Sequence, residues 1–404
     1  MKKQVLTGLI AACGVCAADT ALAQSSVTMY GLADAGVQSS SFGNGRKLTL
    51  NSGIAEGSRI GFRGVEDLGG GYRAVFTLEA RVEIDNGTQA NALLSSASNQ
   101  NLTQDLSQAG AAFVTSRLPV NVVNSAGALF DRQAFVGLAT PYGTVLLGRQ
   151  YTPGIEVFAL SDAFELGTSG TWLNLASGSA SVYTPGIALR ANQALQYRLQ
   201  LPSGVGMTAM YGFNNTGSLN LARRFMGASL RYKATGFDSG LAFNREQDQV
   251  GNKALVTLTA GASWVVGDAK LFAGFHRMKN DHNAFARALA PGLAATDAAA
   301  LMSNLTLNGD IITLGMHYNV GPGRVMASVN RVNDKRPGNG DATMFALGYD
   351  YFLSKRTDMY VLAARIRNDN VAQYALGGGG YFGGSSSQRG RDGNSTQVGI
   401  RHRF

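Results

Sequence analysis

The sequence predicts an all-β fold, in which sixteen antiparallel strands close into a barrel that spans a membrane. Three observations predict it. Side-chain character alternates with a period of two residues in one segment after another, the number of these segments is even, and the connections between them alternate between short and long.

The segment Tyr72–Arg81 illustrates the alternation, because its even positions are aromatic or aliphatic and most of its odd positions are charged or polar. In a membrane barrel the apolar face meets lipid and the polar face meets a water-filled interior, which sixteen strands leave open. The expected strands are residues 26–36, 57–66, 71–84, 131–139, 143–150, 191–200, 205–213, 225–234, 237–246, 253–266, 268–278, 310–320, 323–332, 341–353, 356–368 and 394–404.

The connections favour a membrane barrel over a soluble sandwich, which has no reason to place every long loop at one end. Closure also lets every backbone amide pair within the protein, as lipid requires. The short turns are Glu66–Gly71, Thr140–Gly143, Pro202–Gly204, Thr235–Gly236, Gly267–Asp268, Gly321–Gly323 and Leu353–Lys355. The long connections are residues 37–56, 85–130, 151–190, 214–224, 247–252, 279–309, 333–340 and 369–393.

The first 23 residues have the features of a cleaved signal peptide, which leaves residues 24–404 as one barrel domain. Lys2 and Lys3 precede the short apolar run Val5–Val15, and Ala21–Ala23 is an A-x-A cleavage site. The run is too short for a membrane anchor. Ile10–Cys13 resembles a lipoprotein acylation site, but the later cleavage site leads directly into the first strand.

Cysteine and histidine usage argues against metal and thiol chemistry. Cys13 and Cys16 both lie in the signal peptide, so the processed chain has no cysteine for disulfides, zinc sites or nucleophilic catalysis. The four histidines lack metal-ligand spacing, and no cofactor is expected. The net charge of +9 would fit a nucleic-acid partner, but an exported chain meets none, and a basic interior that attracts anions explains the charge better.

Several stretches together carry a specific resemblance to a family. The chain resembles the general diffusion porins of Gram-negative bacteria, in the branch common in beta-proteobacteria, from about Ser25 to Phe404. The resemblance is strong in the strands and weak in the long loops. The matching stretches are Ser26–Gly36, Ser58–Gly71, Arg132–Leu138, Tyr142–Gln150, Tyr351–Thr357 and Val398–Phe404.

This resemblance implies a homotrimer in the cell outer membrane, in contact with membrane lipids and lipopolysaccharide. Each barrel would pass ions and small hydrophilic solutes by passive diffusion, with no catalysis. The terminal aromatic Phe404 resembles the signal that the barrel-assembly machinery reads.

The resemblance also implies a constriction, in which the third external loop, residues 151–190, folds into the barrel. Its carboxylates Glu156, Asp162 and Glu165 would lie across the pore from arginines, although each could equally face external water. The resemblance maps the wall residues to Arg59, Arg132, Arg190 and Glu79. Fixed guanidinium charge in a narrow passage favours anions, so weak anion selectivity is expected.

Strand parity supports this mapping only in part. It points Arg59, Glu79 and Arg190 inward, but it turns Arg132 outward unless its strand begins irregularly. Arg149 has the same problem, unless Gly148 forms a bulge. Other inward basic residues would extend an anion path or simply be solvated: Arg63, Arg81, Arg198, Arg231, Lys233, Lys270, Arg324 and Arg401.

Three other functions remain open at this stage. A channel specific for small organic anions or phosphate would share this sequence pattern and differ only in pore geometry. A barrel enzyme would need a serine–histidine or aspartate–histidine arrangement at one rim, which the scattered histidines do not supply. An adhesin or anchor would need a narrow, plugged barrel, which sixteen strands argue against.

Overall fold

A computed structural model of the chain describes residues 26–43, 45–89, 102–117, 128–176, 186–213, 222–248, 251–378, 386 and 388–404. The expected signal peptide, residues 1–23, lies outside the described residues.

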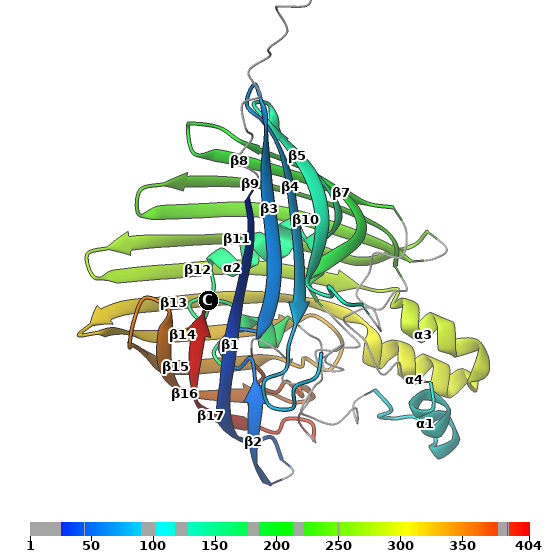
Figure 1. The fold of residues 1–404 in the computed structure, drawn as a ribbon. Helices are drawn as coiled ribbons and strands as arrows, with labels where there is room; N and C mark the ends of the chain where they lie inside the picture. The colour runs from blue at the N-terminus through cyan, green and yellow to red at the C-terminus, as the bar shows by residue number, and fades with distance from the viewer. Residues whose placement is uncertain are drawn as a thin grey trace, which may run out of the picture.

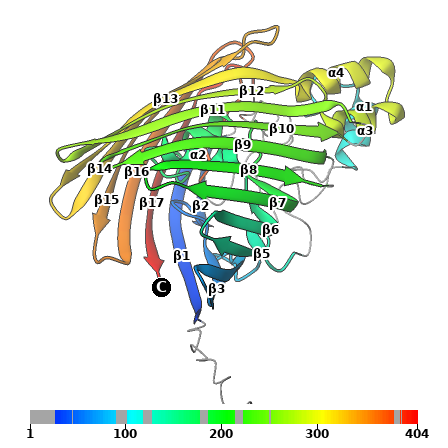
Figure 2. The same ribbon diagram turned by 90° about the horizontal axis from the view of Figure 1, so that it is seen from above.

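The described strands form one closed antiparallel sheet (Figures 1 and 2). β2 and β3 pair with consecutive stretches of β1, so its seventeen strands fill sixteen positions in the wall, as predicted. Pairing between β1 and β17 closes the ring. The strands are β1 (Ser26–Ser41), β2 (Arg46–Ser52), β3 (Arg59–Gly69), β4 (Tyr72–Arg81), β5 (Gln133–Thr140), β6 (Gly143–Tyr151), β7 (Arg190–Gln200), β8 (Val205–Gly212), β9 (Ala222–Ala234), β10 (Phe237–Asp248), β11 (Lys253–Val266), β12 (Ala269–Asn280), β13 (Leu307–Val320), β14 (Gly323–Asp334), β15 (Ala342–Phe352), β16 (Thr357–Asn368) and β17 (Gly393–Arg403).

The predicted turns are confirmed, and one predicted long loop is wrong in part. Each short turn overlaps the range that the sequence predicts, although β3 continues to Gly69 and shortens the first of them. Gly236 and Gly267 adopt positive φ angles of 72° and 59° in their turns, which favours glycine. Residues 37–56 were expected to be a loop, but β1 continues to Ser41 and β2 occupies 46–52. Polar residues dominate this extension, where Val37, Leu48 and Leu50 are the large apolar residues, so its apolar alternation is too short to indicate a membrane strand.

The two faces of the wall differ as a membrane barrel requires. Leu314, Leu347 and Val361 are exposed on the outer face, while Thr313, Asn330 and Gln397 are buried on the inner face. Tyr232, Trp264 and Tyr318 lie on the outer face near the short turns, as an interfacial aromatic girdle would.

The described residues of the third external loop, 152–176 and 186–189, fold into the barrel and are called the inward loop below. It begins with α2 (Pro153–Leu160), where the Thr152 hydroxyl accepts a hydrogen bond from the Ile155 amide and so caps the helix. It also contains the 3₁₀ helix η1 (Trp172–Leu175). The rings of Phe158 and Trp172 stack with centroids 3.7 Å apart.

The inward loop crosses the lumen and fills one side of it. α2 contacts strands β8–β12, and the Ser169 amide donates a hydrogen bond of 2.8 Å to the side chain of Gln397 on β17. Tyr374 and Leu376 of the last external loop join the same buried apolar cluster as Phe158 and Trp172. A cavity remains on the opposite side, against β3–β7.

A small helical layer covers part of the external rim (Figure 1). It consists of α1 (Gln108–Thr115), α3 (Ala284–Leu289), the 3₁₀ helix η3 (Ala290–Gly292) and α4 (Ala295–Leu305), which bury apolar side chains against one another. The Ser107 hydroxyl, which caps α1, donates to the Asp297 carboxylate at 2.6 Å. Among the described residues, no helix is long and apolar enough to cross a membrane.

Candidate functional site

Arginines from neighbouring strands line the cavity beside the inward loop. Arg59 begins β3, Arg132 directly precedes β5 and Arg190 begins β7. Arg59 lies opposite Arg81 in the β3–β4 ladder, and Arg190 lies opposite Tyr151 in the β6–β7 ladder. All five side chains line the same cavity.

Two residues hold these arginines in place. Glu79 accepts a hydrogen bond of 2.8 Å from Arg132 Nε, and its second oxygen lies 3.4 Å from Arg59 Nε. The Tyr151 hydroxyl accepts hydrogen bonds of 2.9 Å from both Arg132 and Arg190, and the Arg190 guanidinium lies 4.6 Å from the Tyr151 ring centroid. Bonds to charged groups in a buried setting fix side-chain geometry strongly.

The two residues with unfavourable parity both lie at strand irregularities, and Arg132 lines the cavity. Arg132 is buried and precedes β5, and its backbone amide donates to the Glu79 carbonyl at 3.1 Å, so an irregular strand start re-aims it. The β6–β7 register shifts between Gly148 and Gln150, which leaves Arg149 on a bulge. Arg149 Nε then reaches the Asp131 carbonyl at 2.6 Å.

The loop side of the cavity is mostly hydrocarbon. The barrel side of the cavity carries Arg59, Arg81, Arg132 and Arg190, which we call the arginine wall. The loop side that faces this wall consists of the apolar side chains of Ile155, Leu166, Leu173 and Leu189. Glu56 and Glu165 are the carboxylates that line the cavity with them. The expectation of three loop carboxylates opposite the arginines is therefore wrong for Glu156 and Asp162.

Glu156 and Asp162 are engaged elsewhere. Glu156 forms an ion pair with Arg198 and lines a separate hollow with Arg198 and Arg231. Asp162 is buried within the loop and accepts hydrogen bonds from the Phe164 and Leu166 amides at 2.9 and 3.1 Å. Burial raises the pKa of the Asp162 carboxyl to about 7, against the opposing effect of these bonds.

Glu165 anchors the inward loop to the far wall. Its two oxygens accept hydrogen bonds of 2.7 and 3.0 Å from Arg324 on β14. Burial would raise the pKa of Glu165, but the Arg324 guanidinium outweighs it and holds that pKa at about 2.

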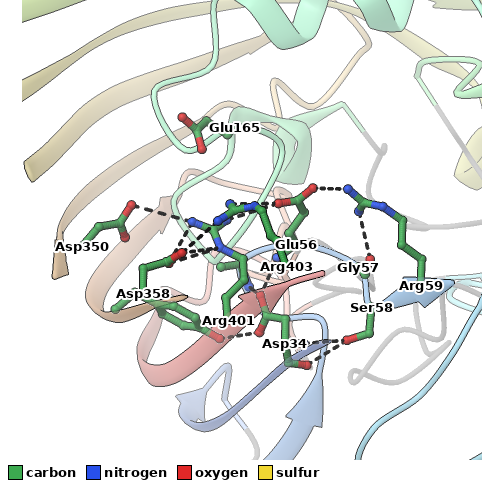
Figure 3. Close-up of polar contacts among 12 residues, drawn as sticks. Asp34, Glu56, Gly57, Ser58, Arg59, Glu165, Asp350, Asp358, Arg401 and Arg403 are labelled. Carbon is green, nitrogen blue, oxygen red and sulfur yellow. Dashed lines mark hydrogen bonds and ion pairs between the residues drawn. The ribbon is translucent and has the colours of Figure 1, made fainter. Parts of the chain in front are cut away.

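A second charged cluster adjoins the first (Figure 3). Glu56 pairs with Arg59 on one side and lies 3.4 Å from Arg401 and 3.3 Å from Arg403 on the other. Asp358 accepts hydrogen bonds of 2.9 Å from both Arg401 and Arg403. Burial raises the pKa of Glu56, but the surrounding guanidinium groups lower it overall.

Sequence analysis missed Glu56, Tyr151 and Asp34. The Asp34 carboxylate accepts hydrogen bonds from the Ala55 and Glu56 amides at 2.9 and 2.7 Å, which fixes the break between β2 and β3 and places Glu56. The sequence did contain an indication of Asp34, which lies within a predicted strand. Burying a carboxylate there costs free energy unless hydrogen-bond donors pair with it.

The described residues contain no group of three or more metal-ligating side chains that could hold an ion. A closed barrel, narrowed by a loop against a charged wall, defines a membrane channel.

The chain belongs to the Gram-negative porin family, whose model matches residues 7–371. It is 27% identical to outer membrane porin protein 32 of Delftia acidovorans, covering 98% of this chain and 99% of the relative. It is 26% identical to an outer membrane porin protein of Bordetella pertussis, covering 100% of both chains. These relatives confirm the predicted family and its beta-proteobacterial branch.

Solved structures confirm the barrel. An anion-selective porin from Comamonas acidovorans matches with a TM-score of 0.70 and 24% identity, covering 94% of this chain and 100% of that one. OmpF of Salmonella typhi matches with a TM-score of 0.61 and 17% identity, covering 94% and 97%. The protein is an outer-membrane channel for passive diffusion.

Proposed function

We propose that this channel is weakly anion-selective and that Arg59, Arg132 and Arg190 carry the selectivity. The carrying observation is the cavity itself, where four arginines face hydrocarbon and two carboxylates. Guanidinium groups stay charged at any relevant pH, and apolar walls strengthen their field across a narrow passage. The structural relative from Comamonas acidovorans is described as anion-selective, in line with this proposal.

The acidic residues have positioning roles in this proposal. Glu79 holds Arg59 and Arg132, and Glu165 holds the inward loop through Arg324. Glu156 adds a second attachment through Arg198, and Asp162 maintains the loop turn. These contacts support a rigid aperture more than a field between opposed charges.

Reversal potentials in a planar bilayer under a potassium chloride gradient test the proposal. The reversal potential of the wild-type protein should lie on the side of the chloride equilibrium potential, and Arg59→Gln with Arg190→Gln should move it toward the potassium equilibrium potential. Arg117→Gln with Arg356→Gln removes the same charge from exposed positions outside the barrel wall and should change little. A cation-side potential for the wild type would overturn the assignment.

General diffusion is the favoured mode over a channel specific for small organic anions. Conductance should then rise linearly with salt, and millimolar organic anions should not block it. Saturating conductance, or block by an organic anion, would favour the specific channel instead.

The remaining expectations are proposals of the same kind. The protein is not an enzyme, and it functions as a homotrimer; a related Vibrio cholerae structure is described as a trimer form. Residues 1–23 are removed on export, leaving 24–404. Phe404 serves as the assembly signal, and its backbone pairs with Gly31 at 3.0 and 3.1 Å while its side chain stays exposed. Cross-linking, N-terminal sequencing and a Phe404 deletion test these points.

A further inference from the structure

The second external loop, which joins β4 to β5, docks on the far side of the external mouth. Its helix α1 packs against α3 and α4 of the loop that joins β12 to β13 (Figures 1 and 2). Around the ring, β6–β11 separate the two loops in one direction, and β14–β17, β1 and the shared position of β2 and β3 separate them in the other, so six wall positions lie on each side. The two loops therefore start from opposite sides of the barrel. Residues 102–117 and 281–306 together are called the external cap below.

Hydrogen bonds fix α1 on α4. The amide and the hydroxyl of Ser107 donate to the two oxygens of the Asp297 carboxylate at 2.8 and 2.6 Å. The Asn304 side chain donates to the Gln104 carbonyl at 2.7 Å. The two helices approach so closely that a Cβ at Gly110 would lie 2.2 Å from a carboxylate oxygen of Asp297. Because hydrogen bonds to a carboxylate are stronger than those between neutral groups, the Asp297 contact sets the position of α1.

Apolar packing continues from the external cap into the inward loop. Leu173 and Leu189 of the inward loop pack against the buried cluster of the cap, whose members include Leu102, Val114 and Leu301. The same two leucines pack against the buried cluster of the inward loop itself and line the cavity opposite the arginine wall. The external cap therefore overhangs the lumen and contacts the side chains that form the apolar side of the cavity.

The inward loop is thus held from two directions. Glu165 is tied to the barrel wall through Arg324, whereas Leu173 and Leu189 have the external cap as a neighbour. Close-packed side chains transmit displacements because they leave few voids between them. Without the cap, these leucines would lose apolar contacts on their external side and would be free to move away from the arginine wall, which would widen the cavity.

We propose that the external cap is a specificity-determining element of the channel: it holds Leu173 and Leu189 in place and so limits the size of the solutes that pass. The second external loop then acts on permeation, although none of residues 102–117 lines the cavity. The proposal goes beyond passive diffusion, and it does not depend on anion selectivity, because the size limit is tested with uncharged solutes.

Two substitutions release the external cap in different ways. Gly110→Ala places a methyl group where the Asp297 carboxylate lies and so separates this carboxylate from Ser107, although alanine favours an isolated helix more than glycine does. Asp297→Ala removes the acceptor of both Ser107 hydrogen bonds. Gln108→Ala is the matched control, because the Gln108 side chain is exposed on α1.

Swelling of liposomes that contain the purified protein measures the size limit. The swelling rate in raffinose or stachyose, relative to the rate in glucose, should rise severalfold for Gly110→Ala and for Asp297→Ala, and Gln108→Ala should match wild type. Relative rates that are equal in all four proteins would overturn the proposal. A wild-type reversal potential on the potassium side would contradict the anion selectivity alone and would leave this result unaffected.

An engineered disulfide compares the docked and the released cap in one folded protein. Gly110→Cys with Asp297→Cys places two Cβ atoms 3.1 Å apart, slightly closer than the lower end of about 3.5 Å for disulfides, so a small shift allows the bond. Cys13→Ser and Cys16→Ser remove the native cysteines. The oxidised protein should have the wild-type size limit, and reduction should raise its relative swelling rate in stachyose severalfold. A rate that does not change on reduction would contradict the role of the cap.

The same disulfide identifies the chain on which α1 docks. Denatured, unreduced protein should run on gels as single chains, because Ser107 and Asp297 meet within one chain. Linked pairs of chains would place α1 on a neighbouring subunit and would refute the proposal.

Discussion

Arg324 on the barrel wall holds Glu165 of the inward loop through two hydrogen bonds, of 2.7 and 3.0 Å. The contact ties the middle of the loop to a strand far from both loop ends, and Arg324 also binds Asp350 at 2.8 Å. The aperture beside the arginine wall therefore depends on an ion pair on the opposite side of the lumen.

Arg324→Gln should loosen the inward loop. Single-channel recordings at neutral pH should show frequent current fluctuations that wild-type protein lacks, since the bidentate contact is lost and Glu165 is left near Asp350. Arg356→Gln on a short turn should record like wild type. Quiet currents in Arg324→Gln would mean that apolar packing alone holds the loop.

Acid should loosen the loop in wild-type protein. The pKa of Glu165 is held at about 2 in the folded state, below the roughly 4.3 of a free glutamate. The contact therefore stabilises the loop above about pH 4, and this stability is lost as pH falls toward 2. Current fluctuations should rise in that window, and Arg324→Gln should not show the transition. Wild-type currents that stay quiet to pH 2 would contradict the assignment.

Tyr151→Phe should disorder the arginine wall without removing a charge. The change deletes the one oxygen that accepts from both Arg132 and Arg190, and hydrogen bonds to charged groups contribute about 1.5–3 kcal/mol each. A lower unfolding temperature and a weaker chloride preference are expected. Tyr142→Phe is the matched control, because that side chain is 76% exposed on a short turn. Equal behaviour of the two variants would remove Tyr151 from the site.

Glu79→Gln should strengthen anion selectivity and weaken the fold. It removes the carboxylate that offsets Arg59 and Arg132, so the wall becomes more positive, while a buried ion pair is broken. The reversal potential should move further to the chloride side, and the unfolding temperature should fall. A shift toward the cation side would show that Glu79 matters only by positioning the arginines.

Local periodicity explains why the strands could be predicted and parts of the site could not. The alternation in Tyr72–Arg81 depends only on which face of the strand meets lipid, so it can be recognised from the amino-acid sequence. The alternation predicted the wrong direction for Arg132, because the position of this residue depends on a hydrogen bond from its amide to the Glu79 carbonyl on another strand. The directions of Glu156 and Asp162 depend on how the inward loop folds against the wall. Such contacts join residues far apart in sequence and leave no periodic trace.

Gly148→Ala should damage the arginine wall through the backbone. Gly148 has a φ of 134°, and an added Cβ would lie 2.1 Å from the Ala134 carbonyl oxygen, so the bulge that aims Arg149 could not form as it is. Reduced folding into liposomes is expected, and any folded protein should show altered selectivity. Gly251→Ala also has a positive φ, of 92°, but its Cβ would meet open space, so it should fold nearly normally. If both variants fold and conduct alike, the bulge does not position the arginine wall.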